Sequence, residues 1–350
     1  MSKSNIITRR PKLKSRLGQE GVALLLTLLV TVILSVVVLE FNYLMRVQAT
    51  LSGNLIDDLR AEAAAAAGVE TARAVLLNDL AADSEKEAMS DTLEEEWAEE
   101  ISVETRSSKT VAAIFDEMSK LNLNRLVERA SIEYDIQNTN RFMVENVRRL
   151  FESIELDPDL VEKIVDWIDE DDEEQPFGAE SSYYESLSPP VRCKNGLLDS
   201  VEELLLMEGF DKGILYGDDE SPGLAEFVTV CGDEKGLVNI NTAPEEVIAA
   251  VVNSGSVASM IMDMREEKPF ENAEDMATRV PDMKLSNKFT TWSTFFLVSS
   301  TGRTFPPGSP AQGPPTREVR LKALLKRVQD REDTEQDYFS IETVFWKAGR

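Results

Sequence analysis

One stretch near the amino terminus constrains this chain more than any other, an uncharged apolar run from Val22 to Leu39. At about 1.5 Å per residue in a helix, a run of this length nearly spans the hydrocarbon core of a bilayer. Six basic residues precede the run, and Glu20 is the one acidic residue among them. Because cationic flanks stay cytoplasmic, the sequence predicts a single inner-membrane anchor with a cytoplasmic amino terminus and a periplasmic body. A cleaved secretory signal is the alternative, but the run exceeds a usual h-region and no small-x-small site follows it closely.

The helical pattern continues beyond this anchor. Strong helix formers and helical spacing of apolar residues extend past Glu40 to about Leu80, as in AEAAAAAGVETARAVLLNDL. The pattern predicts one helix over residues 22–80, roughly 90 Å long, apolar in its first half and amphipathic in its second. Thr27, Thr31 and Ser35 are the only polar residues in the apolar run and lie on one face. Their hydroxyls either allow close packing of a neighbouring helix or bond back to the helix's own carbonyls.

Composition narrows the classes of function. The 350 residues carry 37 basic and 64 acidic side chains, a formal net charge of −27, which argues against nucleic-acid binding because phosphate backbones require clustered cations. Histidine is absent, so Ser-His and Cys-His nucleophiles and His-containing zinc sites are excluded. Two cysteines cannot build a four-thiolate zinc site. Composition leaves room only for enzymes that work through carboxylates or lysines.

The start of the apolar run resembles a known processing site. Gly21 followed by VALLLTLLV is similar to the prepilin peptidase site of type IV pilin-like proteins, which implies cleavage between Gly21 and Val22 and a leader over residues 1–21. Most such proteins have Glu at the fifth mature position, where this chain has Leu26. A missing Glu there is the mark of the minor pseudopilins of the type II secretion system protein K family, which this chain resembles.

The middle of the chain reads as helical and duplicated. KLNLNRL at 120–126 and GLVNINTAP at 236–244 share an aliphatic-Asn-aliphatic-Asn core, and an amphipathic helical stretch follows each. This repetition predicts two related helical subdomains within residues 119–290. The stretch after the second copy resembles helix-hairpin-helix (SAM-like) modules. Its turn at 253–256 lacks the glycine pair of DNA-binding members, so we expect the fold without DNA binding.

An acidic cluster gives the sharpest candidate for a ligand site. Seven of the nine residues at 166–174 are acidic. Their repulsion is relieved either by solvent, in an exposed turn, or by Ca²⁺ with six to eight oxygen ligands, although EF-hand spacing is absent. The family resemblance implies calcium in this part of the molecule, and we expect Asp169, Asp171 and Glu180 as ligands. The acidic segment 83–100 reads instead as a solvated helix or mobile linker.

Two cysteines lie in the part expected outside the cytoplasm. There a disulfide between Cys193 and Cys231 would persist and close an interval of 38 residues. The chain-entropy estimate for such a bridge is roughly 3–4 kcal/mol. Two free buried cysteines are the alternative.

Strand patterns flank the helical middle. Residues 101–115 read as one or two strands, and residues 295–303, 319–323 and 339–345 alternate as strands do. We therefore expect an α+β fold: a long amino-terminal membrane and spine helix, a pseudopilin-type antiparallel sheet packed on its outer half, and a large inserted all-α domain. The expected divisions are the leader (1–21), the helix (22–80), an acidic linker with the first strands (81–118), the helical insert (119–290) and the last strands (291–350).

The resemblance implies assembly rather than catalysis. A protein K-like minor pseudopilin would cap the pseudopilus tip and start pseudopilus assembly. Its expected partners are minor pseudopilins I and J, the other pseudopilus subunits and the prepilin peptidase. Contact with secreted protein substrates is a further expectation. Leu26 fits a cap, because only a subunit with none above it can dispense with the Glu that pairs with a neighbour's terminal amine. The alternatives are a membrane-anchored DNA receptor, which needs a basic face, and a carboxylate-dependent periplasmic hydrolase, which needs paired acids in a cleft.

Overall fold

The computed structural model describes residues 17–86, 89–128, 138–218, 221–281, 285–306, 313–330 and 338–349. The chain divides into two compact units, residues 1–59 and residues 60–350. The part of the predicted leader before residue 17 lies outside the described residues.

The described part of the first unit is helical. It belongs to α1 (Leu17–Lys86), which confirms the predicted helix over 22–80 and extends it at both ends. Within the described residues, α1 is the one helix long and apolar enough to cross a membrane. Thr27 and Thr31 donate hydrogen bonds to carbonyls three residues earlier, and Ser35 donates to the carbonyl of Thr31 at 2.7 Å. All three hydroxyls thus donate hydrogen bonds to carbonyls of their own helix, which is one of the two predicted alternatives.

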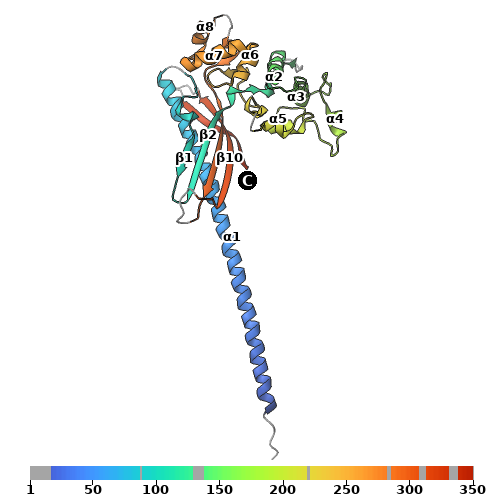
Figure 1. Ribbon diagram of the computed structural model, residues 1–350, viewed down its shortest axis with the longest axis vertical. Coiled ribbons are helices and arrows are strands. Elements are labelled where there is room, and N and C mark those ends of the chain that lie inside the picture. Colours follow the sequence, from blue (N-terminus) through green and yellow to red (C-terminus); the bar gives the residue numbers. More distant parts are fainter. Residues whose placement is uncertain are drawn as a thin grey trace, which may run out of the picture. The chain divides into compact units, whose positions relative to one another are not determined.

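The second unit contains a five-stranded antiparallel sheet in the order β1-β2-β9-β10-β11 (Figure 1). The strands from both ends of the body meet in it, which confirms the predicted antiparallel sheet. Strand β9 (Phe295–Thr304) lies in the centre, between β2 (Ser108–Asp116) and β10 (Arg317–Asp330). Strands β1 (Ile101–Glu104) and β11 (Tyr338–Gly349) form the two edges.

Small residues let α1 lie very close to this sheet. A Cβ atom on Gly302 would lie 2.1 Å from the carbonyl oxygen of Ala61, so the site accepts only glycine without movement. Ser300 Oγ donates to the carbonyl of Ala65 at 2.7 Å, and Thr110 Oγ1 donates to that of Ala64 at 2.8 Å. The apolar core between helix and sheet comprises Ala65, Val69, Ala72, Leu76, Trp97, Ile114, Phe296, Val298, Leu321, Ala323, Leu325 and Ile341.

The helical insert leaves the sheet after β2 and returns at β9. Asp116, the last residue of β2, pairs with Phe296 at the start of β9, so both connections lie at one end of the sheet. Within the second unit, α1 runs from Ala61, beside Gly302, to Asp79, which contacts Arg327. Arg327 donates its backbone N–H to the carbonyl of Thr294, the residue just before β9, so Arg327 lies at the end of the sheet where the insert is attached. The insert therefore lies at the end of the sheet that α1 reaches last (Figure 1).

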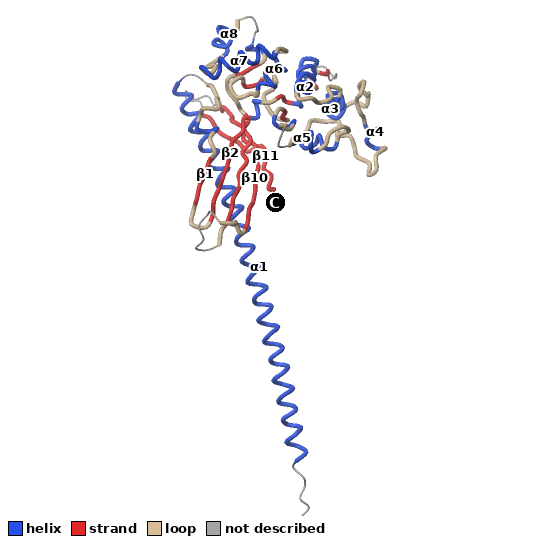
Figure 2. Tube along the Cα trace, viewed as in Figure 1, coloured by secondary structure: helices blue, strands red, loops and turns tan. Residues whose placement is uncertain are grey.

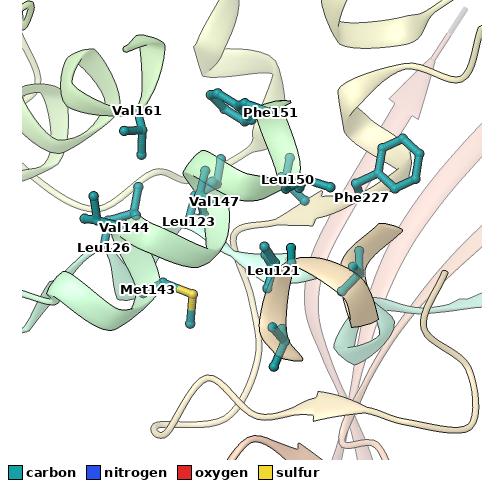
Figure 3. Packing of buried hydrophobic residues seen from close by; sticks show 14 of the residues in the cluster. Leu121, Leu123, Leu126, Met143, Val144, Val147, Leu150, Phe151, Val161 and Phe227 are labelled. Atoms are coloured by element: carbon teal, nitrogen blue, oxygen red, sulfur yellow. The ribbon is translucent and has the colours of Figure 1, made fainter. Parts of the chain in front are cut away.

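The insert consists of two structural repeats, each bounded by a pair of short parallel strands. In the first, β3 (Leu121–Asn122) pairs with β6 (Val228–Thr229). Between them lie η3 (Leu123–Arg125), β4 (Val127–Glu128), β5 (Asn138–Thr139), α2 (Arg141–Ser153), α3 (Leu160–Ile168), α4 (Ser181–Glu185), η4 (Val201–Leu206), α5 (Lys212–Tyr216) and η5 (Leu224–Glu226). Figure 3 shows part of its core, which includes Leu121, Leu150 and Phe227.

The second repeat is shorter. Strand β7 (Val238–Asn239) pairs in parallel with β8 (Phe289–Thr290). Between them lie α6 (Glu245–Val252), α7 (Gly255–Glu267), α8 (Ala273–Arg279) and η6 (Leu285–Asn287). Figure 2 shows α6, α7 and α8 grouped together. The hairpin of α6 and α7 occupies the predicted place, and its assignment to the helix-hairpin-helix class stays a prediction.

Equivalent asparagines organise both repeats. Asn124 closes a two-way bond with Leu198: its Nδ2 donates to the carbonyl at 2.9 Å and its Oδ1 accepts from the N–H at 2.8 Å. Asn241 does the same with Phe270, at 2.9 and 2.8 Å. The shared Asn-x-Asn motif therefore reflects a shared structural role, which supports the predicted duplication.

The acidic segment before β1 is not the solvated helix or mobile linker that we predicted. In its described part Asp91 is fully buried, and Arg327 Nη1 donates to both of its carboxylate oxygens at 2.7 and 2.9 Å. Trp97 is 1% exposed and packs edge-on against Phe296, with ring centroids 5.3 Å apart. The prediction failed because the partner cation lies 236 positions away along the chain.

Candidate metal centre and amino-terminal site

The acidic loop between α3 and α4 folds back on the end of α3. Asp166, in the last turn of α3, accepts hydrogen bonds from the backbone N–H of Gln175 to both carboxylate oxygens, at 3.3 and 3.2 Å. A Cβ atom on Gly178 would lie 1.9 Å from Asp166 Oδ2, so only glycine lets the loop approach so closely. These contacts bring residues 175–180 back over the helix end that precedes them.

Three carboxylates converge under this loop. Asp166, Asp169 and Glu180 are all buried, and one oxygen of each lies within 4.8 Å of the others. Asp169 Oδ1 and Glu180 Oε1 are buried with no hydrogen-bond partner among the described residues. Buried polar atoms are rarely left without a partner, so the two oxygens mark a space that is incomplete without a donor or a cation.

Electrostatics point in the same direction. Burial, reinforced by the neighbouring carboxylates, raises the pKa of Asp169 to about 7. Burial is also the main cause that raises the pKa of Glu180 to about 7 and that of Asp166 to about 6. All three groups are therefore costly as anions unless a positive charge joins them. Carboxylate oxygens are the ligands that Ca²⁺ prefers, so the donor set fits that ion.

The structure places two of the three expected ligands in this cluster. Asp169 and Glu180 belong to it, but Asp171 is exposed and accepts a hydrogen bond from the N–H of Glu173 at 2.8 Å. Asp166, which we did not select, takes the third position. Its spacing of three residues before Asp169 at a helix end is the sequence signal that would have found it, because such residues lie on one face.

The predicted disulfide between Cys193 and Cys231 is corrected, because both cysteines are free thiols. Cys193 is buried near the acidic cluster, where its Sγ contacts the carbonyl of Asp166 at 3.8 Å. The Sγ of Cys231 instead lies 3.5 Å from Thr229 Oγ1, at the end of β6. The two thiols occupy different surroundings, a fact that spacing along the chain could not reveal.

The residues of the expected processing site lie on the exposed surface of α1. Val22 is 57% exposed and Leu26 55% exposed, and nothing surrounds Gly21 within 4 Å of where a Cβ would be. The apolar side chains of this segment thus have no partners among the described residues of the chain itself, as expected of an anchor.

Comparison with known proteins shows which family the helical insert resembles. Models described as type II secretion system (T2SS), protein K, match residues 119–216 and residues 238–291. These two segments fall on the first and the second helical repeat. Over these two segments the chain is similar to the type II secretion system protein K family. The predicted resemblance to this family of minor pseudopilins is confirmed.

Relatives that match about three quarters of the chain agree with this resemblance. Type II secretion system protein K of Pseudomonas aeruginosa is 27% identical over 279 residues, covering 77% of this chain and 79% of the relative. The protein K of Aeromonas hydrophila is 26% identical over 277 residues, covering 75% and 81%. One chain in the crystal structure of the GspK-GspI-GspJ complex from the type 2 secretion system of enterotoxigenic Escherichia coli has the same fold. Its TM-score is 0.59 at 17% identity, with 87% of this chain and 99% of that chain covered.

The similarity to protein K supports a minor pseudopilin role in type II secretion for this chain. The apolar first part of helix α1 is consistent with anchoring in the inner membrane. The fold agrees with the same role, because a long helix packed on an antiparallel sheet and a helical insert are all present.

Proposed function

We propose that this chain caps the tip of the type II secretion pseudopilus. The observation that carries the proposal is the position of the insert. Both of its connections lie at the end of the sheet that α1 reaches last, so two helical repeats cover the end where a further subunit would stack. A subunit shaped in this way can end a filament but cannot lie within its shaft.

Leu26 supports the same position. In a shaft, a Glu at this place pairs with the terminal amine of a neighbour, because an unpaired charge in an apolar surrounding is costly. Leu26 offers no such partner, and the exposed apolar surface of α1 around it suits contact with lipid and with other apolar helices. We infer that prepilin peptidase cleaves between Gly21 and Val22 before assembly, with the body in the periplasm.

The partners are inferred from the relative of known structure, which is found in a complex of GspK with GspI and GspJ. We propose that this chain likewise joins minor pseudopilins I and J and starts assembly of the other pseudopilus subunits. Contact with secreted protein substrates belongs to this proposal, because a tip is the part of the filament that reaches the exported protein first.

We further propose that Asp166, Asp169 and Glu180 bind Ca²⁺. The ion would neutralise the charge of the three buried carboxylates. It would also coordinate Asp169 Oδ1 and Glu180 Oε1, the two oxygens that have no hydrogen-bond partner among the described residues. Its role would be structural, since it would fix the loop over residues 169–180 against the end of α3.

The test of the tip role is the distribution of the chain along isolated pseudopili. A gold-labelled antibody to the helical insert should mark one end of each filament, while an antibody to the major subunit marks the length. Gold particles spread along the shaft at the frequency of a repeating subunit would overturn the proposal.

A further inference from the structure

An open groove lies between the sheet and the first helical repeat. Its volume is about 590 Å³. The sheet contributes Leu297, Leu324 and Phe345, one from each of the strands β9, β10 and β11, and the repeat contributes Leu215 and Tyr216 from α5. Tyr216 is 51% exposed and Phe345 44% exposed, so the groove presents apolar surface to solvent.

A pair of lysines lines one side of this groove. Lys322 of β10 and Lys347 of β11 stand directly opposite each other in the strand register, and both are exposed. Like charges at opposed positions repel each other. Neither lysine forms a salt bridge within the described part of the chain. Glu202, which also lines the groove, is close enough for the charges of both lysines to lower the pKa of its carboxyl.

The other carboxylates of the groove are already engaged. Glu117 pairs with Lys120 at 3.0 Å, and Asp199 pairs with Lys194 at 2.8 Å. Of the carboxylates that line the groove, only Glu202 therefore remains to balance Lys322 and Lys347. This is a local excess of positive charge in a chain whose formal net charge is −27.

The free edge of the sheet borders the groove. Among the described strands, β11 has a neighbour on one side only, and Arg73 of α1 covers part of its edge by donating to the carbonyl of Ile341 and to Thr343 Oγ1. A register shift then follows, after which Val344 is 55% exposed and Trp346 44% exposed. Such an edge leaves backbone N–H and C=O groups available to an added chain.

We propose that this groove binds an extended segment of a partner protein, one in which acidic and apolar residues alternate. The segment lies along the open part of β11, places apolar side chains against Leu324 and Phe345, and sets a carboxylate against Lys322 and Lys347. Extended peptides commonly bind in this way, with main-chain bonds to a sheet edge and side chains in adjoining pockets. The proposal holds whether or not the chain caps a filament.

The test uses the full-length chain in detergent micelles and a short fluorescein-labelled peptide of alternating valine and glutamate. Fluorescence anisotropy should show saturable binding that weakens as salt is added. The double variant K322E/K347E should weaken binding about tenfold or more, since it reverses the charges that meet the carboxylate. Its matched control is K235E/K268E, which changes the net charge equally at two exposed lysines outside the groove and should bind as the parent does.

Two further comparisons make the result specific. A peptide of alternating valine and lysine should bind far more weakly, and W346A should weaken the glutamate peptide while leaving the thermal midpoint unchanged. The proposal is overturned if the glutamate peptide shows no saturable binding, or if K322E/K347E and K235E/K268E bind it equally well. Equal binding of the two peptides would overturn it as well.

Discussion

Three carboxylates that share one buried space repel each other unless protons or a cation intervene. Asp166, Asp169 and Glu180 are in this situation, and the N–H groups of the loop satisfy only part of their oxygens. Binding of Ca²⁺ would relieve both the repulsion and the missing contacts. The proposal therefore concerns the stability of the loop as well as its affinity for metal.

Removing the charge of a converging carboxylate should weaken calcium binding. D169N and E180Q keep the shape of the side chains but lose the charge, so we expect each to lower Ca²⁺ affinity by about tenfold or more. Terbium luminescence measures this directly, because Trp167 lies between two of the ligands in sequence and can sensitise the ion. D171N is the matched control, since Asp171 is exposed and outside the cluster. A larger loss for D171N than for D169N would contradict the assignment.

The same cluster predicts an unusual pH dependence of the metal-free protein. The pKa values of Asp169 and Glu180 are raised to about 7, above their unfolded values, so the folded state holds these protons more tightly. The contribution of the cluster to the free energy of unfolding should thus fall as pH rises from about 4, near the unfolded pKa values, to about 7. Thermal unfolding in a chelator should show that D169N/E180Q gains stability relative to the parent as pH rises from 5 to 7.5. An equal difference at both pH values would contradict the raised pKa values.

At the level of single residues, the sequence predicted where acidic side chains gather better than it predicted which side chains contact each other. The density of acids marked the loop, and Asp169 and Glu180 do converge, but the choice between Asp166 and Asp171 depended on where α3 ends. The bond between Asp91 and Arg327 was invisible, because it joins positions far apart in an otherwise ordinary acidic stretch. The disulfide failed for the same reason, since compartment and spacing do not determine which side chains meet.

At the level of elements, the two asparagine clamps should carry equal weight. N124A leaves the buried N–H and carbonyl of Leu198 without the asparagine, and N241A leaves the N–H of Phe270 without it, while the Phe270 carbonyl keeps the bond from Ser90 Oγ at 3.1 Å. Each variant should lower the free energy of unfolding by about 1–3 kcal/mol. Chemical denaturation of the full chain measures the loss. N78A, at an exposed position on α1, is the control and should change stability little, because alanine favours a helix. A clear loss for one clamp and none for the other would contradict the equivalence of the repeats.

The contact between α1 and β9 makes a second prediction at this scale. In G302A the new methyl group would meet the backbone of α1, which cannot move as a side chain can, so we expect a loss of about 1–3 kcal/mol. The control is G255A, since Gly255 has open space around it at the start of α7 and alanine there should be neutral or slightly stabilising. Thermal unfolding of both variants compares them, and a G302A variant as stable as the parent would contradict the close packing.

Most elements could be predicted because their signals are local. Helical spacing gave α1, and alternation indicated the strands of the sheet on both sides of the insert. The Asn-x-Asn repetition predicted the two subdomains, since the same local turn needs the same residues. The parallel strand pairs β3 with β6 and β7 with β8 were not predicted, because two-residue strands carry no periodicity.

At the scale of the whole molecule, the proposed tip role rests on where the insert leaves the sheet. The charge, the missing histidines and the absence of a glycine pair in the turn at 253–256 already disfavoured catalysis and DNA binding. The register of β2 with β9 then sets the insert at one end of the body, which the sequence could not show. Both proposals, the tip position and the groove for a partner, depend on this placement of the insert.

The most direct test of the central claim, that the chain is processed and assembled as a pseudopilin, is its intact mass after expression with and without a prepilin peptidase. We predict that the active peptidase removes residues 1–21 and leaves Val22 as the new amino terminus, while an inactive peptidase leaves the chain whole. A chain that stays uncut with the active enzyme, or one cut beyond Leu39 as a secretory signal would be, would contradict the account.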